Sequence, residues 1–395
     1  MSKGIAFVTT VYLARVILPE GFGILGYATA FVSYFLLFID FGFDTISVKK
    51  IANDNSVIPK FVNNVVSFRI ILAALIFLLL MIIVYFLNET VIVKTALTLA
   101  GVNLFVQAIT TEFVFQATEK IKYLAVKVVA KNILILIAVF LFVKNVSDVL
   151  LVIVVSFAAN LIMNLWLYSR YAKLFDRFRW SVEKSFLKKL ISESFPLIIS
   201  SFMISIYYNL DMVMLGNIKT PTEVGIYNAA YKIFLIGLIP LGAIVKIFLP
   251  SLSKIGDKKE LKNTLKNYAV LMFAGGVAIS LSIYFLAERS VNVIYGAKYA
   301  EAVIPLMILS LNVLVIAVNI FFGNPLTVWG RQKEYSVAIT FGAIVNIILN
   351  FLFIPRYSYN GAALATLLSE VAVFMGVFYL FNKNLKYILK ERDIS

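Results

Sequence analysis

Residues 65–87 read VVSFRIILAALIFLLLMIIVYFL, and this stretch decides the fold because Arg69 is its only charged side chain. A helix of this length is about 34 Å long, enough to cross the roughly 30 Å hydrocarbon core of a bilayer. Inside a bilayer the backbone must satisfy its own hydrogen bonds, and a helix does so within one segment. The stretch therefore predicts a transmembrane helix.

Similar apolar runs recur along the whole chain, in which 61% of residues are hydrophobic, 14% are charged and the mean hydropathy is +0.93. These values lie outside the range of soluble globular proteins. We predict an all-α integral membrane protein of about twelve transmembrane helices, in two six-helix lobes. The predicted spans are residues 3–18, 23–46, 65–87, 91–116, 124–143, 149–168, 191–215, 225–249, 268–286, 302–322, 336–354 and 361–381.

The net charge of +15 comes from Lys and Arg in the gaps between these runs. No basic face with interleaved aromatic residues accompanies it, so nucleic acid is not a predicted partner. Basic residues in alternate loops outnumber those in the remaining loops by about three to one. Because Lys and Arg resist translocation, this bias predicts a multi-pass protein with both termini in the cytoplasm. The basic-rich loops lie at residues 49–60, 120–127, 170–189, 254–266, 331–333 and 383–392.

The long polar stretch near the middle predicts two halves, residues 1–168 and 191–395, joined by a basic cytoplasmic linker at residues 169–190, with a short cytoplasmic tail after the last span. A weak internal repeat supports the division into two halves, since four residue types recur at a constant offset of about 202 residues. They are Pro19, Gly23, Ile24 and Ala28, matched by Pro221, Gly225, Ile226 and Ala230. Six spans in each half predict a parallel repeat with a transport site between the halves.

Cationic side chains inside predicted spans are candidates for binding phosphate. Lys232 and Lys246 lie in the eighth span on either side of Pro240, about 21 Å apart along a helix. Arg69 and Lys131 lie one to two turns inside the third and fifth spans. Two cations at different depths suit a phosphate-bearing cargo, because their attraction for phosphate grows where water is scarce. The alternative is that each side chain extends to the membrane surface.

Uncharged polar residues and acids form the second group of candidates. Asn103 and Gln107 recur at four-residue spacing in the fourth span, where they either bind sugar hydroxyls or join helices through hydrogen bonds. Asp211, Asp40 and Glu370 are candidates for a coupling proton or sodium ion, and the alternative is a structural salt bridge to a lysine of a neighbouring helix.

The chain contains no cysteine and no histidine, which removes thiol nucleophiles, imidazole bases and the commonest transition-metal ligands. It also lacks a glycine-rich phosphate loop and a nucleophile elbow. A membrane-embedded glycosyltransferase would need long external loops, whereas the predicted external loops are short. The sequence therefore predicts a protein that is not an enzyme and has no cofactor or metal.

Several segments resemble the Wzx-type polysaccharide flippases of the multidrug/oligosaccharidyl-lipid/polysaccharide exporter superfamily. They are YLARVILPEGFG at residues 12–23, DFGF at 40–43, EVGIYNAAYK at 223–232, YGAKY at 295–299 and NGAALA at 360–365. Asn228 lies in the third segment. The resemblance covers almost the full chain. It implies two lobes around a central cavity, alternating access and a cationic cavity for an anionic headgroup.

The resemblance also implies a cargo, a lipid-linked oligosaccharide on a polyprenyl phosphate or diphosphate. We therefore expect a flippase that carries this cargo from the cytoplasmic to the outer leaflet of the cell membrane for surface glycan assembly. Its expected partners are the cargo, membrane lipids and glycan-assembly proteins. The alternative is a cation-coupled multidrug or metabolite antiporter of the same superfamily, whose cavity should be lined by acids such as Asp40, Asp211 and Glu370.

Overall fold

The computed structural model describes residues 2–254 and 258–391, and every regular element in these ranges is a helix. Ten of the helical segments described are long and apolar enough to cross a membrane. The predicted all-α membrane fold is thus confirmed. The end of the predicted C-terminal tail, residues 392–395, lies outside the described residues.

Two of the ten segments are divided by a residue with left-handed backbone. Helix α1 (Ser2–Asp40) has φ 58° at Leu18, directly before Pro19, and α14 (Gln332–Glu391) has φ 49° at Ser358. Both divisions fall between runs that the sequence predicts to be separate spans. The structure is therefore compatible with twelve spans, and the number twelve stays a prediction.

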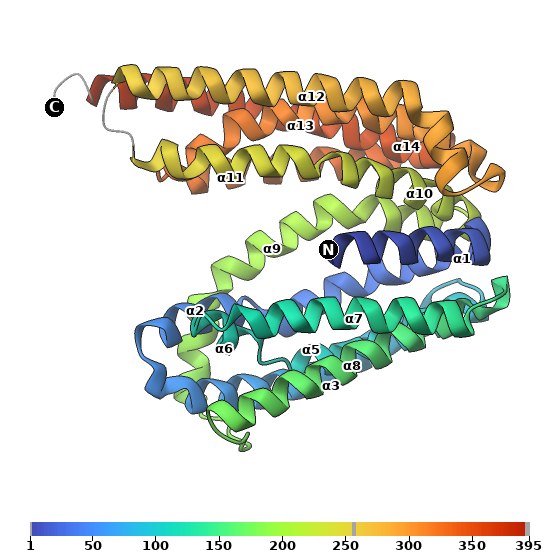
Figure 1. The fold of residues 1–395 in the computed structure, drawn as a ribbon, viewed down its shortest axis with the longest axis vertical. Coiled ribbons are helices and arrows are strands. Elements are labelled where there is room, and N and C mark those ends of the chain that lie inside the picture. Colours follow the sequence, from blue (N-terminus) through green and yellow to red (C-terminus); the bar gives the residue numbers. More distant parts are fainter. Residues whose placement is uncertain (1, 255–257, 392–395) are drawn as a thin grey trace. The chain divides into compact units, whose positions relative to one another are not determined.

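The chain forms two compact units, Met1–Ser205 and Ile206–Ser395. In the first unit α7 and α8 lie side by side (Figure 1). Its interior is packed by apolar side chains of α2, α3, α6 and α8, including Phe43, Val65, Phe113 and Leu167. Besides α1, the elements of this unit are α2 (Phe43–Asn53), η1 (Asn55–Val57), α3 (Ile58–Phe86), α4 (Val91–Gly101), α5 (Asn103–Ala108), α6 (Glu112–Ala117), α7 (Ile121–Phe142), η2 (Val146–Asp148), α8 (Val149–Leu174) and the first part of α9 (Lys184–Ile218).

The predicted fourth span, residues 91–116, is not one continuous helix. It consists of α4, α5 and α6, with breaks at Val102 and at residues 109–111. The second break contains Thr110 and Thr111, whose branched side chains lose freedom in a helix. In transporters, interrupted helices of this kind accompany polar sites at membrane depth.

The second unit is built on closely packed helices, of which α12, α13 and α14 run side by side (Figure 1). The two halves of α14 approach so closely that a Cβ at Gly342 would lie 2.1 Å from Cγ2 of Val373. The predicted eighth span is divided at Leu238. The elements that follow α9 are α10 (Pro221–Gly237), α11 (Ile239–Lys254), α12 (Lys258–Ile294), η3 (Ala297–Ala302), α13 (Val303–Val328) and α14.

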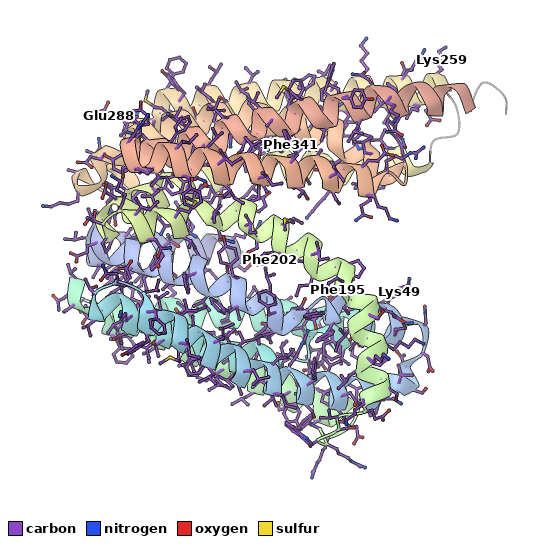
Figure 2. All side chains as sticks on the ribbon, turned by 180° about the vertical axis from the view of Figure 1, so that it is seen from behind. Lys49, Phe195, Phe202, Lys259, Glu288 and Phe341 are labelled. Atoms are coloured by element: carbon purple, nitrogen blue, oxygen red, sulfur yellow. The ribbon has the colours of Figure 1, made fainter. Side chains whose placement is uncertain are left out.

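The outward faces of the helices carry apolar side chains. Leu75 is 59% exposed, Phe285 76% and Phe351 63%. Charged residues gather toward helix ends, and Figure 2 shows Lys259 and Glu288 near opposite ends of α12. An apolar belt of this extent is unfavourable in water and suits a lipid environment.

Candidate functional site

Asp211 of α9 holds its carboxylate inside the second unit, with 3% of the residue exposed. Its Oδ2 accepts hydrogen bonds from the Tyr227 hydroxyl at 2.8 Å and from Oγ1 of Thr366 at 2.6 Å. Its Oδ1 accepts a third, from Nδ2 of Asn350 at 2.5 Å. These donors belong to α10 and to the two halves of α14. Three helices therefore converge on a single carboxylate.

The polar cluster continues from Asp211 along α14. Nδ2 of Asn350 also donates to Oδ1 of Asn346 at 3.0 Å, and Asn346 donates to the Ser369 hydroxyl at 3.4 Å. The neighbour of Ser369 is Glu370, a second buried acid, whose carboxylate and main-chain carbonyl accept hydrogen bonds from Nδ2 of Asn319 of α13. One polar cluster thus links α9, α13 and α14.

The cluster holds more oxygen acceptors than donors. Oδ1 of Asn350 and Oδ1 of Asn319 are buried and accept no hydrogen bond from the described residues. In the same described ranges no Lys or Arg pairs with Asp211 or Glu370. Carboxylate, amide and hydroxyl oxygens are ligands for hard cations, and a carboxylate also takes up a proton. The geometry is therefore suited to a proton or a small cation.

In the first unit the predicted phosphate ligand Arg69 is fully buried. Its Nη2 contacts Oδ1 of Asp40 at 2.5 Å and Oδ1 of Asp44 at 2.9 Å, while Nε donates to the Ile39 carbonyl at 3.2 Å. The guanidinium thus ties α3 to the end of α1 and to α2. Asp40, predicted as an ion-coupling residue, forms a structural ion pair, and its partner is an arginine rather than the lysine of the alternative.

A second polar network crosses the first unit beside the interrupted fourth span. The buried Lys127 of α7 pairs with Glu112 of α6 and donates to Oδ1 of Asn164 at 2.7 Å. Asn164 donates to the carbonyl of Asn160 at 2.9 Å, and Asn160 lies 3.4 Å from Oδ1 of Asn103. Asn103 therefore joins helices through hydrogen bonds, the alternative to its predicted sugar contact.

The remaining predicted binding residues do not form one cluster. Lys232 of α10 and Lys246 of α11 are exposed, and Lys131 of α7 is half-buried. None of these lysines forms an ion pair within the described ranges. Gln107 is half-buried in α5, and Asn228 is buried in α10. Lys232 and Lys246 thus remain accessible cations on the second unit.

The sequence pattern did not identify several partners of the buried charges. Sequence alone does not point to Tyr227, Asn350 or Thr366 as partners of Asp211, and it places Lys127 at the end of a basic loop. A signal was present, because Asn346 and Asn350 are four residues apart inside an apolar run and so share one helix face. Which helix that face meets depends on tertiary packing, so the pairing with Asp211 required the structure.

A family model described as "Polysaccharide biosynthesis protein" matches residues 1–256. A capsular polysaccharide biosynthesis protein, CapF of Staphylococcus aureus, is 27% identical over 387 residues, 95% of this chain and 95% of that protein. A relative from Escherichia coli K12 named as an O-antigen transporter is 27% identical over 390 residues, 96% of this chain and 92% of that protein.

Two solved structures share the fold over 99% of this chain. An inward-facing multidrug resistance transporter of the MATE family has a TM-score of 0.75 at 12% identity and is covered over 96% of its length. The lipid II flippase MurJ, in an inward closed conformation, has a TM-score of 0.68 at 16% identity and is covered over 91%. At these identities the likeness shows the architecture alone.

Proposed function

The chain belongs to the polysaccharide biosynthesis protein family, and on this premise we propose that it is a flippase that translocates a lipid-linked oligosaccharide across the membrane. It is a multi-pass membrane transporter and not an enzyme. The observation that carries the proposal is the match over nearly the full length to a capsular polysaccharide protein and an O-antigen transporter. The fold shared with a lipid II flippase supports it.

The direction and the topology are further parts of the proposal. The lysine-rich loops favour cytoplasmic termini, and surface glycan assembly requires transport from the cytoplasmic to the outer leaflet of the cell membrane. The proposed lobes are residues 1–168 and 191–395, with the basic stretch 169–190 between them. Glycan-assembly proteins that supply or consume the cargo are the proposed partners.

We assign cargo binding to exposed cations and coupling to the buried acids. Lys232 and Lys246 are accessible for a phosphate, and an ammonium group binds phosphate more strongly where water is scarce. Asp211 and Glu370, within their acceptor-rich cluster, are the proposed site for a coupling proton or sodium ion. Arg69, by contrast, we assign to holding α1, α2 and α3 together.

The antiporter alternative is supported by one observation, the fold that the chain shares with the MATE transporter. The relatives that match in sequence over nearly the full chain are named for polysaccharide synthesis or O-antigen transport. The flippase reading is therefore favoured.

Reconstitution tests the proposed function directly. Proteoliposomes would contain the purified protein and a fluorescent polyprenyl-diphosphate oligosaccharide, and a membrane-impermeant reductant would quench the probe in the outer leaflet. We expect the quenched fraction to rise from about one half toward completion, as inner-leaflet cargo is carried outward. Quenching that stays at the level of protein-free liposomes, while a cationic dye is exported, would replace this proposal with the antiporter.

A further inference from the structure

A pocket in the first unit lies at the level where spans end, and none of its lining residues belongs to the polar clusters described above. It has a volume of about 190 Å³ and is lined by residues of α2, α3 and α9. Lys50 lies near the end of the candidate span Ser2–Asn53, while Phe61 and Phe186 lie near the starts of Asn55–Phe86 and Lys184–Ile218. All three walls therefore sit at a membrane surface, where lipid phosphates are found.

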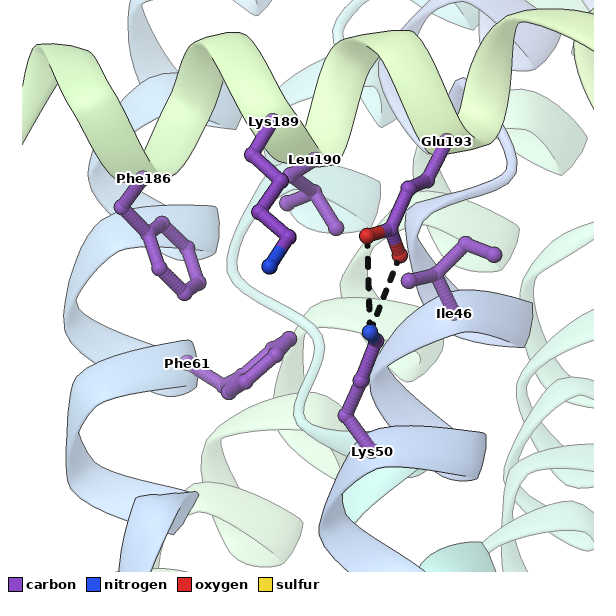
Figure 3. A pocket seen from close by; sticks show the side chains of 7 residues that line it. All are labelled: Ile46, Lys50, Phe61, Phe186, Lys189, Leu190 and Glu193. Atoms are coloured by element: carbon purple, nitrogen blue, oxygen red, sulfur yellow. Dashed lines mark hydrogen bonds and ion pairs between the residues drawn. The ribbon is translucent and has the colours of Figure 1, made fainter.

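Two lysines reach into the pocket from opposite walls, Lys50 from α2 and Lys189 from α9 (Figure 3). The only carboxylate in the lining is Glu193, one helical turn beyond Lys189. Within the described residues Lys189 forms no ion pair. The lining thus carries two positive charges and one negative charge, and the Lys189 ammonium group is not neutralised by a carboxylate of the described residues.

The pairing of Lys50 with Glu193 is loose. Nζ of Lys50 lies 3.3 Å from one carboxylate oxygen and 3.4 Å from the other, whereas charge-assisted hydrogen bonds are usually about 2.7–2.9 Å. The neighbouring pair Lys60–Glu183 is 2.7 Å and therefore tight. An anion that contacts Lys50 and Lys189 together can compete with Glu193, because it gains two cations where the carboxylate has one.

The rest of the lining is apolar. The rings of Phe61 and Phe186 meet edge to face at 4.9 Å, and Ile46 and Leu190 complete the wall. Free phosphate gains nothing from such a surface, whereas the glycerol and first methylenes of a lipid bury apolar area against it. Charge and apolar lining together favour an amphiphilic anion.

We propose that this pocket binds the phosphate of an anionic phospholipid between Lys50 and Lys189, with the start of its acyl chains against Phe61 and Phe186. The site adds a regulatory lipid to the transporter, and its residues differ from Lys232 and Lys246, to which cargo binding is assigned above. A lipid bound in this pocket can influence the second unit, because α9 forms part of the pocket wall and continues into that unit. A phosphate that draws Lys50 from Glu193 changes how the first turns of α9 are held.

Native mass spectrometry of the full-length protein, released from nanodiscs of phosphatidylglycerol and phosphatidylcholine, tests the site. Lys50→Gln with Lys189→Gln should weaken phosphatidylglycerol retention about twenty-five-fold, since each lysine contributes roughly fivefold. The matched control is Lys49→Gln with Lys188→Gln, which removes the same charge from exposed neighbours outside the pocket. It should change retention less than about twofold.

Glu193→Gln provides a gain of binding that a misfolded variant cannot imitate. It removes the competitor for Lys50 and should raise phosphatidylglycerol retention about threefold, with phosphatidylcholine unchanged. Equal weakening by both double variants would overturn the proposal in favour of general surface attraction. Displacement of the lipid by millimolar inorganic phosphate would likewise overturn it, because the site would then recognise phosphate alone. None of these measurements of lipid retention requires transport. A failure of this proposal can therefore be distinguished from a failure of the proposed flippase function.

Discussion

Asp211 and Asn350 are 139 residues apart in sequence, yet Nδ2 of Asn350 lies 2.5 Å from Oδ1 of Asp211 in the interior of the second unit. The contact fixes α9 against the first half of α14. Thr366 from the second half of α14 and Tyr227 from α10 donate the other two hydrogen bonds to the Asp211 carboxylate. Neutral donors surround this carboxyl group, and no Lys or Arg of the described residues pairs with it. This arrangement is expected of a group that exchanges a proton or a cation.

Asp211→Asn should uncouple transport while leaving the fold intact, because the amide is isosteric and keeps an acceptor for the donors. We expect the rate under an imposed sodium or proton gradient to fall about tenfold or more, toward the rate without a gradient. Flux into proteoliposomes with and without each gradient measures it. Asp176→Asn, in the connection between α8 and α9, is the control. If the two variants kept equal gradient dependence, coupling would have to be assigned elsewhere.

Arg69→Ala should destabilise the first unit. Its removal leaves Asp40 and Asp44 facing each other without the buried cation that they share, and breaking a buried pair costs about 3–5 kcal/mol. Thermal unfolding in detergent should therefore shift strongly downward, whereas the exposed Arg177→Ala should have little effect. Unchanged stability with lost transport would instead favour the headgroup contact predicted from the sequence.

The sequence predicts the membrane fold well, because hydrophobic length is a local property. The divisions at Leu18 and Ser358 fall where the sequence predicts separate spans. The fourth span shows where hydrophobic length is insufficient, because residues 91–116 are predicted as one helix and form three. The contacts within the candidate site are harder to predict from the sequence than the membrane spans. Arg69 and Asp40 both lie in predicted spans, but their mutual pairing depends on how α1 packs against α3. Apolar neighbours in sequence indicate that a charge lies within a span, whereas its burial and its partner are set by tertiary packing.

Lys232→Gln should weaken cargo binding without changing stability, because this side chain is exposed and unpaired within the described ranges. Loss of one ammonium–phosphate contact should raise the half-saturating concentration of polyprenyl-diphosphate cargo about tenfold. Lys184→Gln, an exposed lysine at the start of α9, is the charge-matched comparison. Titration of flipping rate against cargo density decides the case, and identical curves for both variants would remove Lys232 from the cargo site.

Gly342 and Gly242 form a matched pair for testing how closely the second unit is packed. A Cβ at Gly342 would lie 2.1 Å from Cγ2 of Val373, whereas one at Gly242 of α11 would have no atom within 4 Å. Gly342→Ala therefore forces the Val373 side chain or the halves of α14 to shift, and overpacking costs about 1–3 kcal/mol. Gly242→Ala should be neutral or stabilise by up to about 1 kcal/mol through helix propensity. Urea unfolding in mixed micelles would show opposite shifts, and equal behaviour of the two variants would contradict the close approach within α14.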